Sequence, residues 1–326
     1  MSINVYERIE DSITSLTTIE ESEKQKLLQG VLRLKKQKIN LMITGATGCG
    51  KSSTINAMFN TEVAKVGVGV DPETMDIQKY ELDNLILWDS PGLGDGKDKD
   101  IIHSKGIIKK LTEFDKNGNP LIDLVLVILD GGSKDLGTSY DLINQVIVPN
   151  LGNNATNRIL VAINQADVAM KGRYWNLNIN QPEPELISFL DKKVISISNR
   201  VREATGIEVC PIYYSAGYKD EDTEQKPWNL SKLLCFIVKN TPEEKRLSYI
   251  NNLSKNEEVW ADDDNLVDYK KETQKSFQDV ATHLTKNTLA GAAAGAAIGS
   301  VIPVIGTAIG AAVGAAVGFI GGLFGW

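Results

Sequence analysis

The spacing of hydrophobic residues changes near residue 38 of this 326-residue chain. Before that point, apolar residues recur at roughly helical intervals between charged ones, which predicts one or two amphipathic helices within residues 1–37 that pack on the main domain. These apolar positions are Ile9, Ile13, Leu16, Ile19, Leu27, Leu28, Val31 and Leu32. After it, short apolar runs alternate with helical segments. This alternation predicts a three-layer α/β domain over residues 38–240, with a mostly parallel sheet between helices.

The apolar runs predict a six-stranded sheet. The expected strands are 39–44, 78–82, 85–89, 121–130, 159–164 and 209–214. The expected helices are 51–59, about 99–114, 139–148, 183–203 and 229–239. Only Asp83 and Asn84 separate the second strand from the third. So short a connection predicts one antiparallel pair at an edge of the sheet.

The first strand runs directly into a glycine-rich loop that is followed by a helix. The loop matches the pattern G-x-x-x-x-G-K-S and comprises Gly45, Ala46, Thr47, Gly48, Cys49, Gly50, Lys51, Ser52 and Ser53. Its glycines let the backbone wrap tightly, so that N–H groups and the positive end of the helix face phosphate oxygens. Lys51 is expected to reach the β- and γ-phosphates, and the Ser52 hydroxyl to bind Mg²⁺. The motif predicts binding of a nucleoside triphosphate.

A second motif, Asp89-Ser90-Pro91-Gly92, closes the third strand. A carboxylate at this place can reach Mg²⁺ through water, and the Gly92 N–H can sense the γ-phosphate. Taken alone, a strand-end Asp before Pro-Gly is equally typical of an ordinary turn. Its position downstream of the phosphate loop favours the metal-binding interpretation.

A third motif, Asn164-Gln165-Ala166-Asp167, follows the fifth strand. The Asp167 carboxylate can accept hydrogen bonds from two adjacent donors on guanine, the N1–H and the 2-amino group. Adenine lacks this pair of donors, so the motif predicts selectivity for guanine.

In this order the three motifs resemble those of the Era-like small GTPases, the class that includes Era, EngA and septin-like proteins. The resemblance covers about residues 38–240. It implies a P-loop GTPase domain that binds GTP or GDP with Mg²⁺ and hydrolyses GTP.

The resemblance also implies roles for residues outside the three motifs. Thr74 resembles the switch threonine whose hydroxyl and carbonyl close over Mg²⁺ and the γ-phosphate, and Thr61 is the alternative for that role. With Lys51 and Gly92, Thr74 completes the expected catalytic set. Ser215 and Ala216 follow the last core strand, where a backbone N–H of the family contacts guanine O6.

Two positions depart from the pattern of that class. Gln165 replaces a lysine whose stem lies against the purine plane, so the affinity for nucleotide is expected to be modest. Leu93 stands where Ras-like proteins carry the glutamine that orients the attacking water. Because leucine cannot hydrogen-bond water, unaided hydrolysis is expected to be slow.

Composition excludes several other classes of protein. A net charge of −7 and a pI near 5.1 give no support for a nucleic-acid-coating surface. Cys49, Cys210 and Cys235 are too few and too scattered for a disulfide framework or a zinc site. With a polar N-terminus that lacks a signal-peptide pattern, they indicate a cytoplasmic protein. Two histidines, His103 and His283, are expected at the surface rather than as metal ligands.

The C-terminal part of the chain divides into a charged and an uncharged segment. Residues 241–286 are rich in charge and are expected to form a charged helical linker of solvated helices, although regularly spaced apolar residues permit packing. Residues 287–326 contain no charged side chain, and glycine recurs there every four residues on both sides of Pro303. This spacing predicts a helical hydrophobic tail with small residues on one face, a glycine zipper.

The tail has three alternative interpretations. A helix over residues 304–326 would be roughly 35 Å long, enough for a bilayer core of about 30 Å. The tail can therefore form a membrane hairpin. Alternatively it pairs chains into homo-oligomers, or it folds back on an apolar surface of its own domain.

Three functions remain open at this point. The first is a GTP-binding, slowly hydrolysing switch whose nucleotide state controls membrane association or assembly. The second is a membrane-active or oligomer-forming structural protein of the dynamin-like or septin-like kind, regulated by nucleotide. A soluble ribosome-assembly GTPase is the third, and the absence of a basic RNA-binding appendage in the sequence argues against it.

Overall fold

The computed structural model describes residues 4–17, 19–59, 77–219 and 224–285, and a six-stranded sheet lies at its centre. The strands are β1 (Ile39–Gly45), β2 (Gln78–Leu82), β3 (Leu85–Asp89), β4 (Leu124–Asp130), β5 (Ile159–Asn164) and β8 (Ile212–Tyr213). Their order in the sheet is β2-β3-β1-β4-β5-β8. Neighbouring strands are parallel except for β2 and β3, which pair Leu82 with Leu85 across the Asp83-Asn84 turn. The expected mostly parallel sheet with one antiparallel edge is confirmed.

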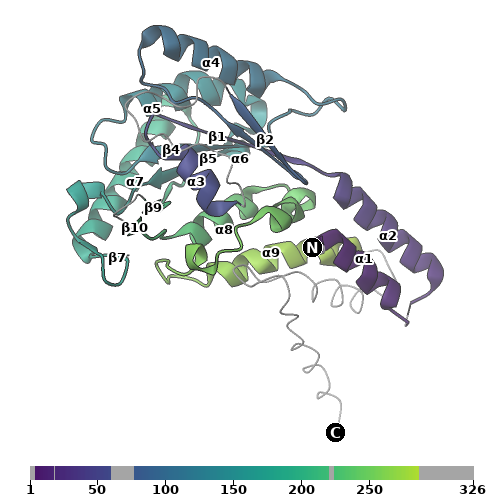
Figure 1. The fold of residues 1–326 in the computed structure, drawn as a ribbon. Helices are drawn as coiled ribbons and strands as arrows, with labels where there is room; N and C mark the ends of the chain where they lie inside the picture. The colour runs from purple at the N-terminus through teal and green to yellow at the C-terminus, as the bar shows by residue number, and fades with distance from the viewer. Residues whose placement is uncertain (1–3, 18, 60–76, 220–223, 286–326) are drawn as a thin grey trace.

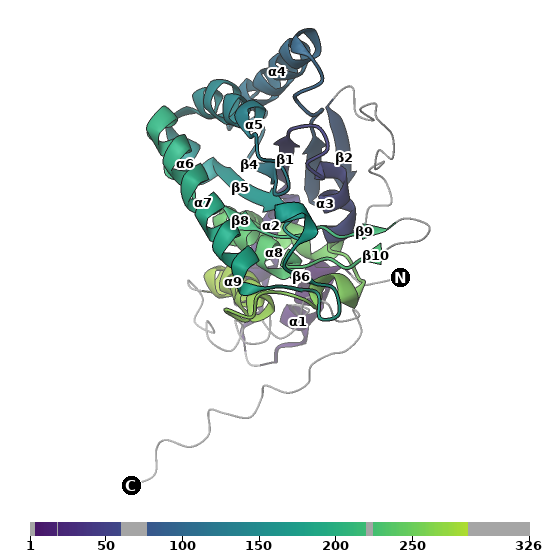
Figure 2. The ribbon, with the colours of Figure 1, turned by 90° about the vertical axis from the view of Figure 1, so that its left-hand side faces the viewer.

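Helices cover both faces of this sheet (Figures 1 and 2). They are α1 (Val5–Ser15), α2 (Glu21–Lys36), α3 (Lys51–Met58), α4 (Lys97–Thr112), α5 (Gly137–Asp141), α6 (Ala155–Arg158), α7 (Pro184–Thr205), α8 (Leu230–Asn240) and α9 (Tyr269–Thr285). Alternate residues of each strand enter opposite cores. On β1, Leu41 and Ile43 pack with α3 and α8, whereas Met42 packs with α4 and α7. The three-layer α/β architecture follows from this alternation.

Three predicted elements differ from the observed ones by more than two residues or in type. β4 begins at Leu124 rather than Leu121, because the Leu121 N–H bonds the Glu113 carbonyl instead of a neighbouring strand. β8 is limited to Ile212–Tyr213, since the Val209 carbonyl accepts a hydrogen bond from Ser198 on α7. The helix expected at 139–148 is divided into α5, a π-helix η1 (Leu142–Ile147) and a 3₁₀ turn η2 (Val148–Asn150). The missing N–H of Pro149 interrupts the regular helical hydrogen bonds there.

Several short elements have no signal in the sequence pattern. They are two small hairpins, β6 (Trp175–Asn176) with β7 (Gln181–Pro182) and β9 (Tyr218–Lys219) with β10 (Glu224–Gln225), and the 3₁₀ turns η3 (Gly152–Asn154) and η4 (Ala169–Gly172). Strands of two residues are too short to show a period of alternation. The first hairpin is anchored by Trp175, whose ring packs edge-on against Trp228 at 5.4 Å between centroids.

The N-terminal helices pack on the domain, as their pattern predicts. Asn4 caps α1 by accepting a hydrogen bond from the Tyr6 N–H, and Glu7 completes the capping box. Tyr6, Ile9 and Ile13 on α1 are buried in the same core as the α3 face of the sheet. The N-terminal segment is thus part of the folded core.

Residues 241–285 are packed rather than solvated, which corrects the expectation of a linker. They form η5 (Glu243–Asn252), η6 (Glu257–Trp260) and α9. The side chains of Tyr249, Trp260 and Phe277 are fully buried, because the regularly spaced apolar positions of this segment enter the core beside α8. Lys232 on α8 forms an ion pair of 2.6 Å with Asp264 that holds the loop before α9. Some charged side chains of this segment, such as Asp264 and Lys245, are largely buried in ion pairs that attach the segment to the domain.

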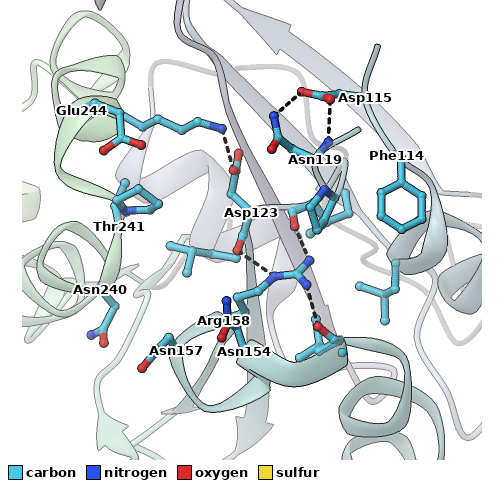
Figure 3. Close-up of a pocket in the computed structure, with 18 of the residues that line it drawn as sticks. Phe114, Asp115, Asn119, Asp123, Asn154, Asn157, Arg158, Asn240, Thr241 and Glu244 are labelled. Carbon is cyan, nitrogen blue, oxygen red and sulfur yellow. Dashed lines mark hydrogen bonds and ion pairs between the residues drawn. The ribbon is translucent and has the colours of Figure 1, made fainter. Parts of the chain in front are cut away.

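A pocket of about 970 Å³ opens at the end of the sheet where β1 and β4 begin (Figure 3). Two charged side chains that line it, Arg158 and Asp123, bind other parts of the protein. The Arg158 guanidinium donates to the carbonyls of Leu151, Ile122 and Asp123, and the Asp123 carboxylate forms an ion pair of 2.6 Å with Lys245 on η5. This end of the sheet attaches the C-terminal segment to the domain. The glycine-rich loop leaves β1 at the opposite end.

Some predictions concern residues outside the described ranges. Thr61 and Thr74 lie outside the described residues, as do residues 287–326, and the side chain of His283 is not described either. Within the described ranges, no helix is both long and apolar enough to cross a bilayer.

Candidate nucleotide-binding site

The phosphate loop connects the carboxyl end of β1 to the first turn of α3. Gly48 and Gly50 have φ angles of +77° and +86°, which side chains with a Cβ rarely adopt. A Cβ on Gly50 would also collide with the Asn164 side-chain amide. These two glycines therefore allow both the turn into α3 and the close approach of the neighbouring loop.

Lys51 lies inside the curve of this loop. Its side chain is buried, and its ammonium group donates to the carbonyls of Gly45 and Ala46 at 3.4 and 3.1 Å. Next to it, Cys49 is fully buried, and burial raises the pKa of its thiol, which keeps the thiol neutral. Lys51 therefore supplies the positive charge inside the phosphate loop.

The expected Mg²⁺ ligands meet beside Lys51. The Ser52 hydroxyl lies 3.1 Å from Asp89 Oδ2. Asp89 Oδ1 is buried and has no hydrogen-bond partner among the described residues. Burial raises the pKa of the Asp89 carboxyl, while the Lys51 charge and the Ser52 hydrogen bond act in the opposite direction. An unpaired buried carboxylate oxygen next to a hydroxyl fits a hard cation with oxygen ligands, such as Mg²⁺.

Mg²⁺ would be held here by few protein groups. No cluster of three or more His, Cys, Asp or Glu side chains suited to a metal occurs in the described part of the chain. Mg²⁺ is usually bound by one or two carboxylates together with waters and substrate phosphates, and Ser52 with Asp89 matches that arrangement. Ser53, also expected at the site, lies half-buried in the first turn of α3.

The segment after Asp89 lies directly on the phosphate loop. The Thr47 N–H donates to the Leu93 carbonyl at 3.0 Å, and the Thr47 hydroxyl donates to Asp95 at 2.9 Å. A Cβ on Gly92 would collide with Thr47, so only glycine allows this approach. The Leu93 side chain is buried in the core with α4. Leucine has no hydrogen-bonding group, so this side chain cannot orient a water molecule.

His103 is buried next to Gly92, which corrects its expected place at the surface. Only 5% of it is exposed, and its Nδ1 lies 3.1 Å from the Gly92 carbonyl oxygen. His103, Ile107 and Leu111 form the buried stripe of α4 at intervals of four residues. A polar residue in the first position of an apolar stripe is the signal in the sequence that could have identified it.

The third motif joins the phosphate loop to the base-binding region. Asn164 donates from Nδ2 to the Cys49 carbonyl at 3.0 Å and accepts at Oδ1 from the Ala216 N–H at 2.9 Å. Gln165, with φ of +60°, donates to the Gly48 carbonyl at 2.8 Å. Both side chains thus hold carbonyl groups of the phosphate loop. Gln165 keeps a contact to this loop despite the loss of the lysine charge.

Asp167 and Ser215 lie side by side at the expected base-binding end. The Ser215 hydroxyl donates to Asp167 Oδ1 at 2.6 Å, which fixes the orientation of the carboxylate. The structure therefore brings the two predicted residues together. The Ala216 N–H is directed to Asn164, so its expected contact with guanine O6 stays a prediction.

Comparison with known proteins supports this interpretation of the motifs. Residues 40–165 match the model of a family described as 50S ribosome-binding GTPase. The uncharacterized protein YfjP of Escherichia coli (strain K12) is 28% identical over 149 residues, which are 44% of this chain and 47% of YfjP. Interferon-gamma-inducible GTPase 10 of Mus musculus is 34% identical over 94 residues, 26% of this chain and 22% of its own. The matches thus span about half or less of these curated relatives.

A solved structure of Era from Aquifex aeolicus, bound to GDP and AlF4−, is 20% identical in sequence. The match covers 63% of this chain and 58% of the Era chain, with a TM-score of 0.38. The family match at residues 40–165 includes the phosphate loop, Asp89 to Gly92 and Asn164. Together with the observed sheet and loop geometry, this match shows that the chain contains a P-loop GTPase domain with the α/β fold.

Proposed function

We propose that this protein binds GTP and GDP with Mg²⁺ and hydrolyses GTP slowly, as a molecular switch. The observation that carries the proposal is the arrangement of Lys51, Ser52 and Asp89 where β1 and β3 end, because the buried Asp89 Oδ1 has no hydrogen-bond partner within the described part of the chain. Lys51 and the loop amides would hold the phosphates, and Ser52 and Asp89 would hold Mg²⁺, directly or through water. Thr74 is the proposed further ligand. Bound Mg²⁺ would neutralise the charge that develops on the phosphate oxygens.

Selectivity for guanine would come from Asp167. Its carboxylate can accept from the guanine N1–H and 2-amino group, while Ser215 holds it in place. Slow turnover is expected because the apolar side chain of Leu93 cannot hydrogen-bond the attacking water and so cannot orient it.

A competition titration tests the proposal on the whole chain. In the presence of Mg²⁺, GTP should displace a fluorescent guanine nucleotide at least about a hundredfold more effectively than ATP, because a site that hydrogen-bonds the 2-amino group leaves its carboxylate unpaired with adenine. Equal displacement by ATP would contradict the assignment of Asp167. Without binding of either nucleotide, the whole proposal is wrong.

For the C-terminal tail, we propose that nucleotide state controls membrane association or assembly through residues 287–326. Two facts support this role: the segment carries no charge and repeats glycine every four residues, and α9, which precedes it, packs against the GTPase domain. A change in the domain thereby has a direct path to the tail. The nucleotide-regulated structural protein of the dynamin-like or septin-like kind is the alternative in which assembly, not signalling, is the output. A role as a soluble ribosome-assembly GTPase is a weaker alternative.

Flotation with liposomes separates these possibilities. Vesicles of phosphatidylcholine and phosphatidylglycerol should carry the full chain to the top of a density gradient, and a chain that ends at Lys286 should stay at the bottom. The comparison is meaningful because the buried residues of α9 remain in the shorter chain. If both chains float equally, the tail is not the anchor; if neither floats, the oligomeric interpretation is favoured.

A further inference from the structure

The backbone of Gly92 is in contact with two different parts of the protein. On one side, it lies against Thr47 of the phosphate loop so closely that a Cβ would collide. On another side, its carbonyl oxygen lies 3.1 Å from Nδ1 of His103, on the second turn of α4. Glycine has the greatest conformational freedom of any residue. Contacts that fix its backbone therefore determine where its N–H points.

The chemistry of the His103 contact has one consistent form. A carbonyl oxygen can only accept a hydrogen bond, so Nδ1 carries the proton and donates it. The contact is buried, and at such a place an unsatisfied carbonyl is costly. The Nδ1–H bond therefore restrains the Gly92 carbonyl.

Helix α4 also binds the backbone of Gly94 and Asp95, which follow Gly92 in the chain. Asp100 on α4 accepts hydrogen bonds at Oδ1 from the N–H groups of Gly94 and Asp95, at 2.9 and 3.3 Å. Asp100 thus holds the backbone at residues 94 and 95, just before α4 begins. Among the described residues, His103 provides the side-chain hydrogen bond from α4 to Gly92 itself. The two contacts attach Gly92, Gly94 and Asp95 to α4.

We propose that His103 is a positioning residue for nucleotide discrimination, which acts through Gly92. By holding the Gly92 carbonyl, it keeps the adjoining backbone in the orientation that presents the Gly92 N–H to a γ-phosphate. This inference rests on the proposed function and deepens it. GDP has no γ-phosphate, so His103 should affect the binding of GTP and not that of GDP.

The test measures the affinities of the full chain for GDP and for the non-hydrolysable analogue GMPPNP, both with Mg²⁺. His103→Leu introduces an apolar side chain of similar size and removes the hydrogen-bond donor. The ratio of GMPPNP affinity to GDP affinity should fall about three- to tenfold, as expected for the loss of one hydrogen bond, with GDP affinity unchanged. His103→Asn should preserve the ratio, because its amide nitrogen can occupy the place of Nδ1.

Each other outcome has a definite meaning. An unchanged ratio in His103→Leu overturns the inference, and so does an equal loss of both affinities, which would indicate a role in the fold alone. If His103→Leu does not fold, the comparison of His103→Asn with His103→Gln decides. Gln places its donor one bond farther out, so it should lower the ratio while Asn keeps it, and equal ratios would overturn the inference. Wild-type protein that binds neither nucleotide would instead reject the proposed function itself.

Discussion

Replacing Lys51 with alanine should lower the affinity for GTP about a hundredfold or more. Lys51 is buried within the phosphate loop, where its ammonium group donates to two loop carbonyls. A triphosphate in this loop would receive charge-assisted hydrogen bonds from Lys51, each contributing about 1.5–3 kcal/mol. Two such bonds correspond to a loss of at least about two orders of magnitude. Isothermal titration of GTP into the purified variant measures the effect.

Lys26→Ala provides a matched control for this experiment. Lys26 lies on α2 with its side chain mostly exposed, and its ion pair with Glu23 has an N–O distance of 3.6 Å. Its removal changes the net charge equally, yet it should leave the affinity for GTP unchanged. The circular dichroism spectrum of Lys51→Ala should match that of the wild type. Unaltered GTP binding by folded Lys51→Ala would refute the assignment of the phosphate loop.

The second large effect is expected for Asp167→Asn, which should move preference from GTP to XTP. Asparagine keeps an acceptor oxygen for the Ser215 hydroxyl, and its amide nitrogen then faces the base. This nitrogen can donate to the C2 carbonyl of xanthine. With guanine it would face the 2-amino group, and two donors cannot form a hydrogen bond with each other. The ratio of the two affinities should change by about two orders of magnitude or more, since an unpaired polar group in a base pocket is strongly rejected.

Competition between GTP and XTP for a fluorescent nucleotide reports this ratio. Asp141→Asn makes the same chemical change at an exposed position on α5 and should leave the preference for guanine intact. If Asp167→Asn also retains the wild-type preference, Asp167 does not contact the base.

The parts of the fold that the sequence predicts well are those in which one residue type meets a strict physical demand. The central strands β1 and β4 are rich in apolar residues on both sides because helices cover both faces of the sheet. Gly48 and Gly50 of the phosphate loop have positive φ angles that other residues rarely adopt, and Gly50 also leaves no room for a Cβ. The pairing of Ser52 with Asp89 follows, since both lie at the same edge of a parallel sheet.

What the sequence does not reveal depends on contacts between distant residues. The partner of the Ala216 N–H is an Asn164 side chain from another loop, and no local pattern specifies it. Burial of His103 depends on the place of α4 over the Leu93 segment. The segment after residue 240 has the composition of a solvated linker, because buried residues such as Tyr249 and Phe277 are diluted among polar ones. Composition alone does not distinguish a docked helix from a solvated one.

The carboxamide of Asn164 touches both halves of the candidate site, one through its nitrogen and the other through its oxygen. A planar group of this kind cannot turn toward one neighbour without turning away from the other. In a bound nucleotide, order imposed at the triphosphate would thereby be passed on to the nucleobase, and the reverse would hold equally. Fragments of the nucleotide, such as guanosine or pyrophosphate, should consequently bind with energies that do not add up to that of the intact molecule.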